Sequence, residues 1–161
     1  MDRLSAPSQH PIPEGTPDPS SYRLQLDGLV RRPLSMSVAE IDRLGQAEHC
    51  GQFTCREGWE VGSDCWQGPP LSAILALAGP LPEATALYAY APGFRSLVPL
   101  ESVPGALLAL RLDGHPLTTA RGAPCRLIVP DQVCQLSVKW IERLELFARR
   151  PDQPVGPRRP E

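Results

Sequence analysis

The chain has 161 residues, the usual length of one globular domain, and 42% of them are hydrophobic. Its 16 Lys and Arg residues against 18 Asp and Glu residues give a net charge of −2, which does not favour binding to nucleic acid or to an anionic lipid surface. No apolar run approaches the ~18 residues of a membrane span, and the first residues show no export signal, so we expect a cytoplasmic protein.

Proline is concentrated at both ends of the chain. Nine of the 20 Pro residues lie in residues 1–20 and 151–161, where they oppose regular secondary structure. We therefore expect a Pro-rich disordered tail over residues 1–20, one domain over residues 21–148 and a second disordered tail over residues 149–161.

The first half of the domain predicts strands around one short helix. Alternating apolar residues over 22–28 predict a half-buried strand. Ser37 and Glu40 have the spacing of a capping box, which predicts a helix from there to about residue 44. A strand is expected over residues 47–55, and three glycines favour a loop over residues 56–68.

The second half is also rich in strands. Pro70 opens an amphipathic helix that ends at Gly79. The strands that we expect after it cover residues 85–91, 95–100, 106–112, 125–129 and 141–147, and for the last of these a helix is the alternative. Together these elements predict a single α+β domain with many strands and long loops.

The five cysteines, Cys50, Cys55, Cys65, Cys125 and Cys134, are an odd number in a chain of this length, which favours reduced thiols. A zinc site formed by His49 and the first three cysteines is disfavoured, because no pair has the spacing of a zinc knuckle. We expect Cys65, Cys125 and Cys134 to be buried thiols.

Cys55 has the most reactive surroundings of the five. Arg56 follows it directly, and an adjacent guanidinium favours the thiolate, the form that binds a metal or attacks a substrate. A nearby Gly58 allows backbone N–H groups to approach an anion. The simpler alternative is a small buried hydrophobic residue at the end of a strand.

Two basic residues stand among apolar neighbours. They are Arg126 and Lys139, the one Lys among the 16 basic residues. A positive charge in such surroundings requires an anionic partner, either a carboxylate of the chain itself or a phosphorylated ligand.

A set of short motifs, all in one order, resembles the molybdopterin-binding domain of the sulfite oxidase family. The resemblance covers about residues 20–147 and includes the bacterial branch related to the catalytic subunit of the methionine sulfoxide reductase system. The motifs are Tyr22-Arg23-Leu24 with Gly28-Leu29-Val30 and Pro33-Leu34; Phe53-x-Cys55-x-Glu57-Gly58-Trp59; Trp66-x-Gly68-x-x-Leu71; Gly93-Phe94 with Val98-Pro99-Leu100; Gly122-x-Pro124-x-Arg126-Leu127-Ile128-Val129-Pro130; and Ser137-Val138-Lys139-Trp140.

The resemblance implies the mixed, β-rich α+β fold of that family and a Mo-molybdopterin cofactor. It implies that Cys55 supplies the protein thiolate to molybdenum. It places Arg126 and the Ser137-Val138-Lys139 triplet at the phosphate end of the cofactor. Arg121 stands where the family usually has His or Asn, so the contact there is either changed or reinforced by charge.

The activity implied by the resemblance is oxygen-atom transfer to or from a small substrate, such as a sulfur oxyanion or a sulfoxide. Arg56 and Arg121 are then catalytic candidates beside Cys55, and Tyr90 and Arg95 are candidates for the substrate pocket. A separate protein would donate or accept the electrons. The alternative is a non-catalytic module that keeps the fold to bind molybdopterin or another protein.

Overall fold

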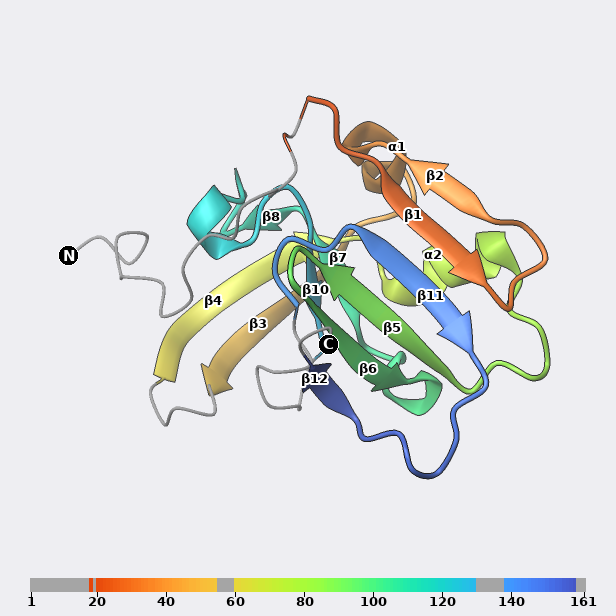
Figure 1. The fold of residues 1–161 in the computed structure, drawn as a ribbon. Coiled ribbons are helices and arrows are strands. Elements are labelled where there is room, and N and C mark those ends of the chain that lie inside the picture. The colour runs from red at the N-terminus through yellow and green to blue at the C-terminus, as the bar shows by residue number, and fades with distance from the viewer. Residues whose placement is uncertain (1–17, 19, 55–59, 130–137, 159–161) are drawn as a thin grey trace.

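The computed structural model describes residues 18, 20–54, 60–129 and 138–158. Three sheets and two α-helices make up this part of the chain (Figure 1). Their bounds in chain order are β1 Leu24–Gly28, β2 Leu34–Met36, α1 Val38–Asp42, β3 Ala47–Thr54, β4 Glu60–Gly68, α2 Leu71–Ala78, β5 Ala86–Ala91, β6 Phe94–Pro99, η2 Leu100–Ser102, β7 Leu107–Ala109, β8 Arg111–Leu112, β9 His115–Pro116, η3 Thr119–Arg121, β10 Arg126–Ile128, β11 Arg143–Phe147 and β12 Gly156–Arg158.

The largest sheet joins the two ends of the domain. Its six strands lie in the order β12-β6-β5-β11-β1-β2, and β1 runs parallel to β11 while the other neighbours are antiparallel. Leu24 and Leu26 of β1 and Leu144 and Leu146 of β11 are all buried, so alternate residues of this parallel pair enter the core. The predictions of a strand at residues 22–28 and at residues 141–147 are thereby confirmed.

The two helices follow their sequence signals closely. Ser37 accepts a hydrogen bond from the backbone N–H of Glu40, whose carboxylate accepts from the N–H of Ser37, and this capping box begins α1. Pro70 is the N-cap of α2, and Gly79 ends that helix in the left-handed conformation with φ +70°. The buried face of α2 packs into the main core through Leu71, Ile74, Leu75 and Ala78.

The prediction of a loop over residues 56–68 is wrong from residue 60 onwards. Residues 60–68 form β4, which lies between β3 and β8 in a four-stranded sheet of order β3-β4-β8-β9. Gly68 is in the strand for a packing reason, because a Cβ atom there would come within 1.8 Å of the carbonyl oxygen of Leu108.

Two further segments differ from the sequence predictions. The strand expected over residues 106–112 is divided into β7, which pairs with β10, and β8, which pairs with β4. Leu110 stands between them and donates its N–H to the carbonyl oxygen of Gln67. The segment predicted as a C-terminal tail contains β12, which pairs with β6. Residues 1–17 of the predicted N-terminal tail lie outside the described residues.

A second, smaller core lies where the four-stranded and two-stranded sheets meet. Trp66 of β4 is 1% exposed and packs there with Leu107, Ala109, Leu112, Leu117, Ala123 and Ile128. Ile128 of this core lies in β10, the strand that begins with the basic residue Arg126. Within the described residues, no helix is long and apolar enough to cross a membrane.

Candidate functional site

The candidate site is built on a tight turn at residues 119–122. Thr119–Arg121 form a single 3-10 turn, and Gly122 follows it with φ +112°. A Cβ atom on Gly122 would lie 3.2 Å from the Cβ of Arg126 and 3.2 Å from the Cα of Lys139. Glycine at this position therefore satisfies the backbone conformation and also lets two basic residues approach the turn.

A second segment holds the turn from one side. Lys139 donates from Nζ to the carbonyl oxygen of Ala120 at 3.1 Å, and Trp140 donates from Nε1 to the carbonyl oxygen of Thr119 at 2.7 Å. The backbone N–H of Leu127 donates to the carbonyl oxygen of Val138 at 2.9 Å, so residues 138–140 run beside β10. Val138 and Trp140 are buried, whereas Lys139 is half-buried.

Arg126 is a charged side chain inside the protein. It is 6% exposed, donates from Nη1 to the carbonyl oxygen of Arg121 at 3.3 Å, and lies over the ring of Trp66 with 4.5 Å between the guanidinium carbon and the ring centroid. The carbonyl bond and the aromatic face orient the guanidinium and compensate part of its lost hydration.

The structure thus brings together four of the residues predicted from the sequence. Arg121, Arg126 and Lys139 place three positive charges around one turn, and buried Val138 fixes the segment that carries Lys139. A guanidinium can bind a phosphate through two donors and an ammonium acts as a point charge, so this donor set suits a phosphate-bearing ligand.

Three other predicted site residues, Cys55, Arg56 and Ser137, lie outside the described residues. Strand β3 ends at Thr54, so Cys55 and Arg56 follow this strand directly in the sequence.

Tyr90 and Arg95 have contacts within the six-stranded sheet. They face each other across β5 and β6, where the hydroxyl of Tyr90 donates to Oε1 of Glu145 at 2.7 Å and Arg95 lies 4.1 Å from the ring centroid of Tyr88. Desolvation and the bond to Glu145 raise the pKa of Tyr90. These contacts place both side chains on the surface of the six-stranded sheet. Among the described residues, none of these contacts joins them to the turn at residues 119–122.

Cys125 is a buried thiol, as predicted. Its side chain is fully buried beside Tyr22, and this desolvation raises the pKa of the thiol to about 12. It therefore stays protonated and unreactive at neutral pH. Cys134 lies outside the described residues.

The prediction of reduced thiols is wrong for Cys50 and Cys65. The two residues face each other across β3 and β4 and form a disulfide, with their Cα atoms 4.0 Å apart. The reason is the extra strand, because β4 replaces the expected loop and places Cys65 opposite Cys50. Cysteine chemistry therefore gives no support to a cytoplasmic location, which stays a prediction.

Comparison with protein families decides the identity of the domain. Residues 9–155 match the family model of the oxidoreductase molybdopterin-binding domain. The chain belongs to this family. Membership confirms the resemblance found in the sequence, and it makes the chain an oxidoreductase domain whose family cofactor is Mo-molybdopterin.

Individual relatives agree with this assignment. The chain is 29% identical to the protein-methionine-sulfoxide reductase catalytic subunit MsrP of Gluconobacter oxydans, over 88% of this chain and 49% of that protein. It is also 29% identical to the uncharacterized oxidoreductase YuiH of Bacillus subtilis, over 80% of this chain and 66% of that protein. The chain thus spans about half of the length of the first relative and about two thirds of the length of the second.

A solved structure confirms the fold. The sulfane dehydrogenase SoxCD of Paracoccus pantotrophus superposes with a TM-score of 0.77 and 26% identity, covering 85% of this chain and 41% of that one. The β-rich α+β fold expected from the resemblance is therefore correct.

Proposed function

We propose that this domain catalyses oxygen-atom transfer to or from a small sulfur compound, either a sulfoxide or a sulfur oxyanion. The names of two relatives support a sulfur substrate, since one is a methionine-sulfoxide reductase and the other a sulfane dehydrogenase. These names describe opposite directions of electron flow, so the test must run in both directions.

The proposal depends above all on one observation, the convergence of Arg126 and Lys139 on the turn at residues 119–122. Arg121, Arg126 and Lys139 would hold the phosphate end of molybdopterin. Ser137 and Val138 belong to the same binding segment in this proposal, and the buried side chain of Val138 would anchor that segment while its neighbours face the ligand.

Cys55 and Arg56 are proposed as the residues at the metal. Cys55 follows β3 directly and would give its thiolate to molybdenum, and the positive charge of Arg56 would favour that thiolate. The bound molybdenum centre supplies two-electron oxygen-atom transfer. The role of Arg56 and of Arg121 toward the substrate would be to attract and orient an anionic or strongly polar S–O group.

A separate protein is proposed as the electron partner. The relative from Gluconobacter oxydans is named as a catalytic subunit, which supports an assembly in which another chain exchanges electrons with this one.

Expression in a host that makes molybdopterin tests the proposal. We expect close to one molybdenum and one pterin per wild-type chain, and turnover with a sulfoxide plus a reduced dye or with sulfite plus an oxidised dye. Cys55→Ala should lose molybdenum and turnover, whereas Cys125→Ser, a change at the buried thiol, should keep both. A wild-type protein that carries the cofactor and turns over neither substrate would favour the non-catalytic module, and one without pterin would refute the binding site as well.

A further inference from the structure

The outer half of the β3–β4 hairpin is a two-stranded arm. β4 pairs with β8 only at Trp66 and Gln67, so within the described strands residues 51–54 and 60–64 pair only with each other. We call these two segments the arm. Figure 1 shows β3 and β4 extending together away from the six-stranded sheet. A two-stranded hairpin without a third strand is marginally stable in water, so the arm needs another stabilising element.

The disulfide stands at the base of this arm. The pair Cys50–Cys65 lies between the pair His49–Trp66, where Trp66 is buried, and the first arm pair, Gly51–Asp64. Cys50 is exposed and Cys65 is half-buried. The cross-link is therefore positioned to limit opening of the arm, and one of its two cysteines is exposed to solvent.

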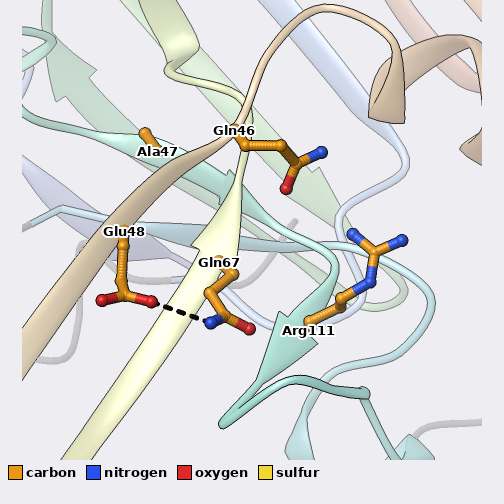
Figure 2. A pocket seen from close by; sticks show the side chains of 5 residues that line it. All are labelled: Gln46, Ala47, Glu48, Gln67 and Arg111. Atoms are coloured by element: carbon orange, nitrogen blue, oxygen red, sulfur yellow. Dashed lines mark hydrogen bonds between the residues drawn. The ribbon is translucent and has the colours of Figure 1, made fainter.

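A carboxylate is fixed beside the exposed sulfur. Oε1 of Glu48 lies 3.2 Å from Sγ of Cys50, and Oε2 of Glu48 accepts a hydrogen bond from Nε2 of Gln67 at 2.8 Å. Figure 2 shows this bond at an open polar depression of about 550 Å³, which is lined by Gln46, Ala47, Glu48, Gln67 and Arg111. Glu48 therefore borders both this depression and the sulfur of Cys50.

The carboxylate of Glu48 interacts differently with the reduced and the oxidised forms of the Cys50–Cys65 pair. A reduced Cys50 has an S–H group that can donate to Glu48, and such a bond to a charged acceptor is stronger than one to a neutral acceptor. The disulfide has no proton to donate. Glu48 is therefore placed to stabilise the dithiol form.

We propose that Cys50–Cys65 is a thiol–disulfide exchange site for a dithiol reductant, and that its redox state controls the pairing of the arm. The reductant's thiolate attacks the exposed Sγ of Cys50, forming a mixed disulfide while the S–S bond to Cys65 breaks. The second thiol of the reductant then displaces Cys50. Two electrons and two protons pass from the dithiol to the cysteine pair, and the reductant leaves as its own disulfide.

Reduction of the folded chain by dithiothreitol at pH 8 tests the exchange, with differential alkylation and mass spectrometry to identify the two cysteines. EDTA is included, because the released thiols and Glu48 lie close enough to bind a metal ion. We expect Cys50 and Cys65 to become alkylated together while Cys125 stays protected. Reduction that requires denaturant would overturn the proposal, because the disulfide would then be purely structural.

Hydrogen exchange tests the control of the arm. In the reduced protein the backbone amides of residues 51–54 and 60–64 should exchange roughly tenfold faster or more, because the loop constraint of the cross-link is lost. The double variant C50S/C65S should show the same increase under oxidising conditions. Amides of β5 serve as the control for global folding. If these amides exchange at the same rate after Cys50 and Cys65 have been reduced, the redox state does not govern the pairing of the arm, and this part of the proposal is wrong.

Glu48→Gln tests the carboxylate. The variant should shift the equilibrium with dithiothreitol toward the disulfide by about fivefold, since the charged acceptor for the Cys50 thiol is lost. Glu101→Gln, at an exposed carboxylate far along the chain, is the matched control. If the wild type and Glu48→Gln have the same equilibrium constant with dithiothreitol, Glu48 does not stabilise the reduced form.

Discussion

The guanidinium of Arg126 lies 4.5 Å from the centre of the Trp66 ring, although the two residues belong to different sheets. Arg126 begins β10 of the two-stranded sheet, and Trp66 lies in β4 of the four-stranded sheet. The contact therefore links the positively charged turn to the smaller core, and it fixes a planar donor group where a phosphate is proposed to bind.

Arg126→Lys tests the value of that planar group. The variant keeps the positive charge but loses the stacking on Trp66 and the bond from Nη1 to the carbonyl oxygen of Arg121. We expect about tenfold weaker retention of pterin, measured as pterin per chain after dialysis. Retention equal to that of the wild type would show that charge alone is sufficient at this position.

Gly122→Ala tests the close approach at the turn. Its Cβ would meet Arg126 and Lys139 at 3.2 Å, and its φ of +112° is unfavourable for an L residue. We expect a loss of roughly 1–3 kcal/mol in the free energy of unfolding, measured by urea denaturation. Gly105→Ala is the matched control, because Gly105 also has a positive φ of +87° but has no atom within 4 Å of the added Cβ. Equal losses in the two variants would contradict a steric role for Gly122.

The ion pair between Asp42 and Arg111 should give a pH-dependent contribution to stability. Arg111 donates to both carboxylate oxygens at 2.9 and 2.8 Å, and these bonds, with one from Gln46, lower the pKa of Asp42 to about 2. A carboxyl whose pKa is lower in the folded state stabilises the protein above its unfolded pKa of 3.8 and loses that effect as the pH falls toward 2.

Asp42→Asn measures this contribution. Because the pair is partly exposed, the variant should lose less than about 1 kcal/mol in the free energy of unfolding at pH 7. The difference from the wild type should shrink between pH 4 and pH 2. A difference that stays constant over this range would mean that the ionisation of Asp42 does not contribute.

Burial should also protect one thiol from alkylation. Cys125 has a pKa of about 12 in the folded protein, so iodoacetamide at pH 8 should leave it unmodified, while the unfolded chain reacts. Mass spectrometry of the modified peptides gives the result. Rapid modification of Cys125 under folding conditions would show that the core around Tyr22 opens readily.

Local signals in the sequence predict much of the fold. The Ser37–Glu40 capping box, the apolar face of α2 and the alternation in β1 and β11 are each decided by residues within a few positions, so the structure agrees with them. The parallel pairing of β1 with β11 is different, because its register depends on residues more than one hundred positions apart.

The error at β4 has a physical cause. Its glycines look like loop residues, but Gly68 is required by the approach of Leu108 in another strand, which no local pattern contains. One signal could have revealed the hairpin. Cys50 and Cys65 stand only 15 positions apart, a separation that a cross-strand disulfide in a hairpin can bridge.

The sequence predicts which residues form the basic site, but it does not predict how they are arranged in space. Arg126 and Lys139 stand out in the sequence because each is a charge among apolar neighbours. Their convergence on the turn depends on Gly122 and on the pairing of Val138 with Leu127, and Trp66 joins them from a distant strand. No local pattern in the sequence links Trp66 to Arg126, because the two residues lie 60 positions apart.

Pterin content of Lys139→Met is the most direct test of the phosphate site. The variant keeps the length and apolar stem of the side chain but loses its positive charge. After expression in a molybdopterin-producing host, we expect pterin per chain to fall about tenfold or more. The free energy of unfolding in urea should fall by only about 1 kcal/mol, because the variant also loses the bond from Nζ to the carbonyl oxygen of Ala120. Arg23→Met, which removes an exposed charge just before β1, should keep the wild-type content. Full pterin content in Lys139→Met would contradict the claim that the turn at residues 119–122 binds the cofactor through its phosphate.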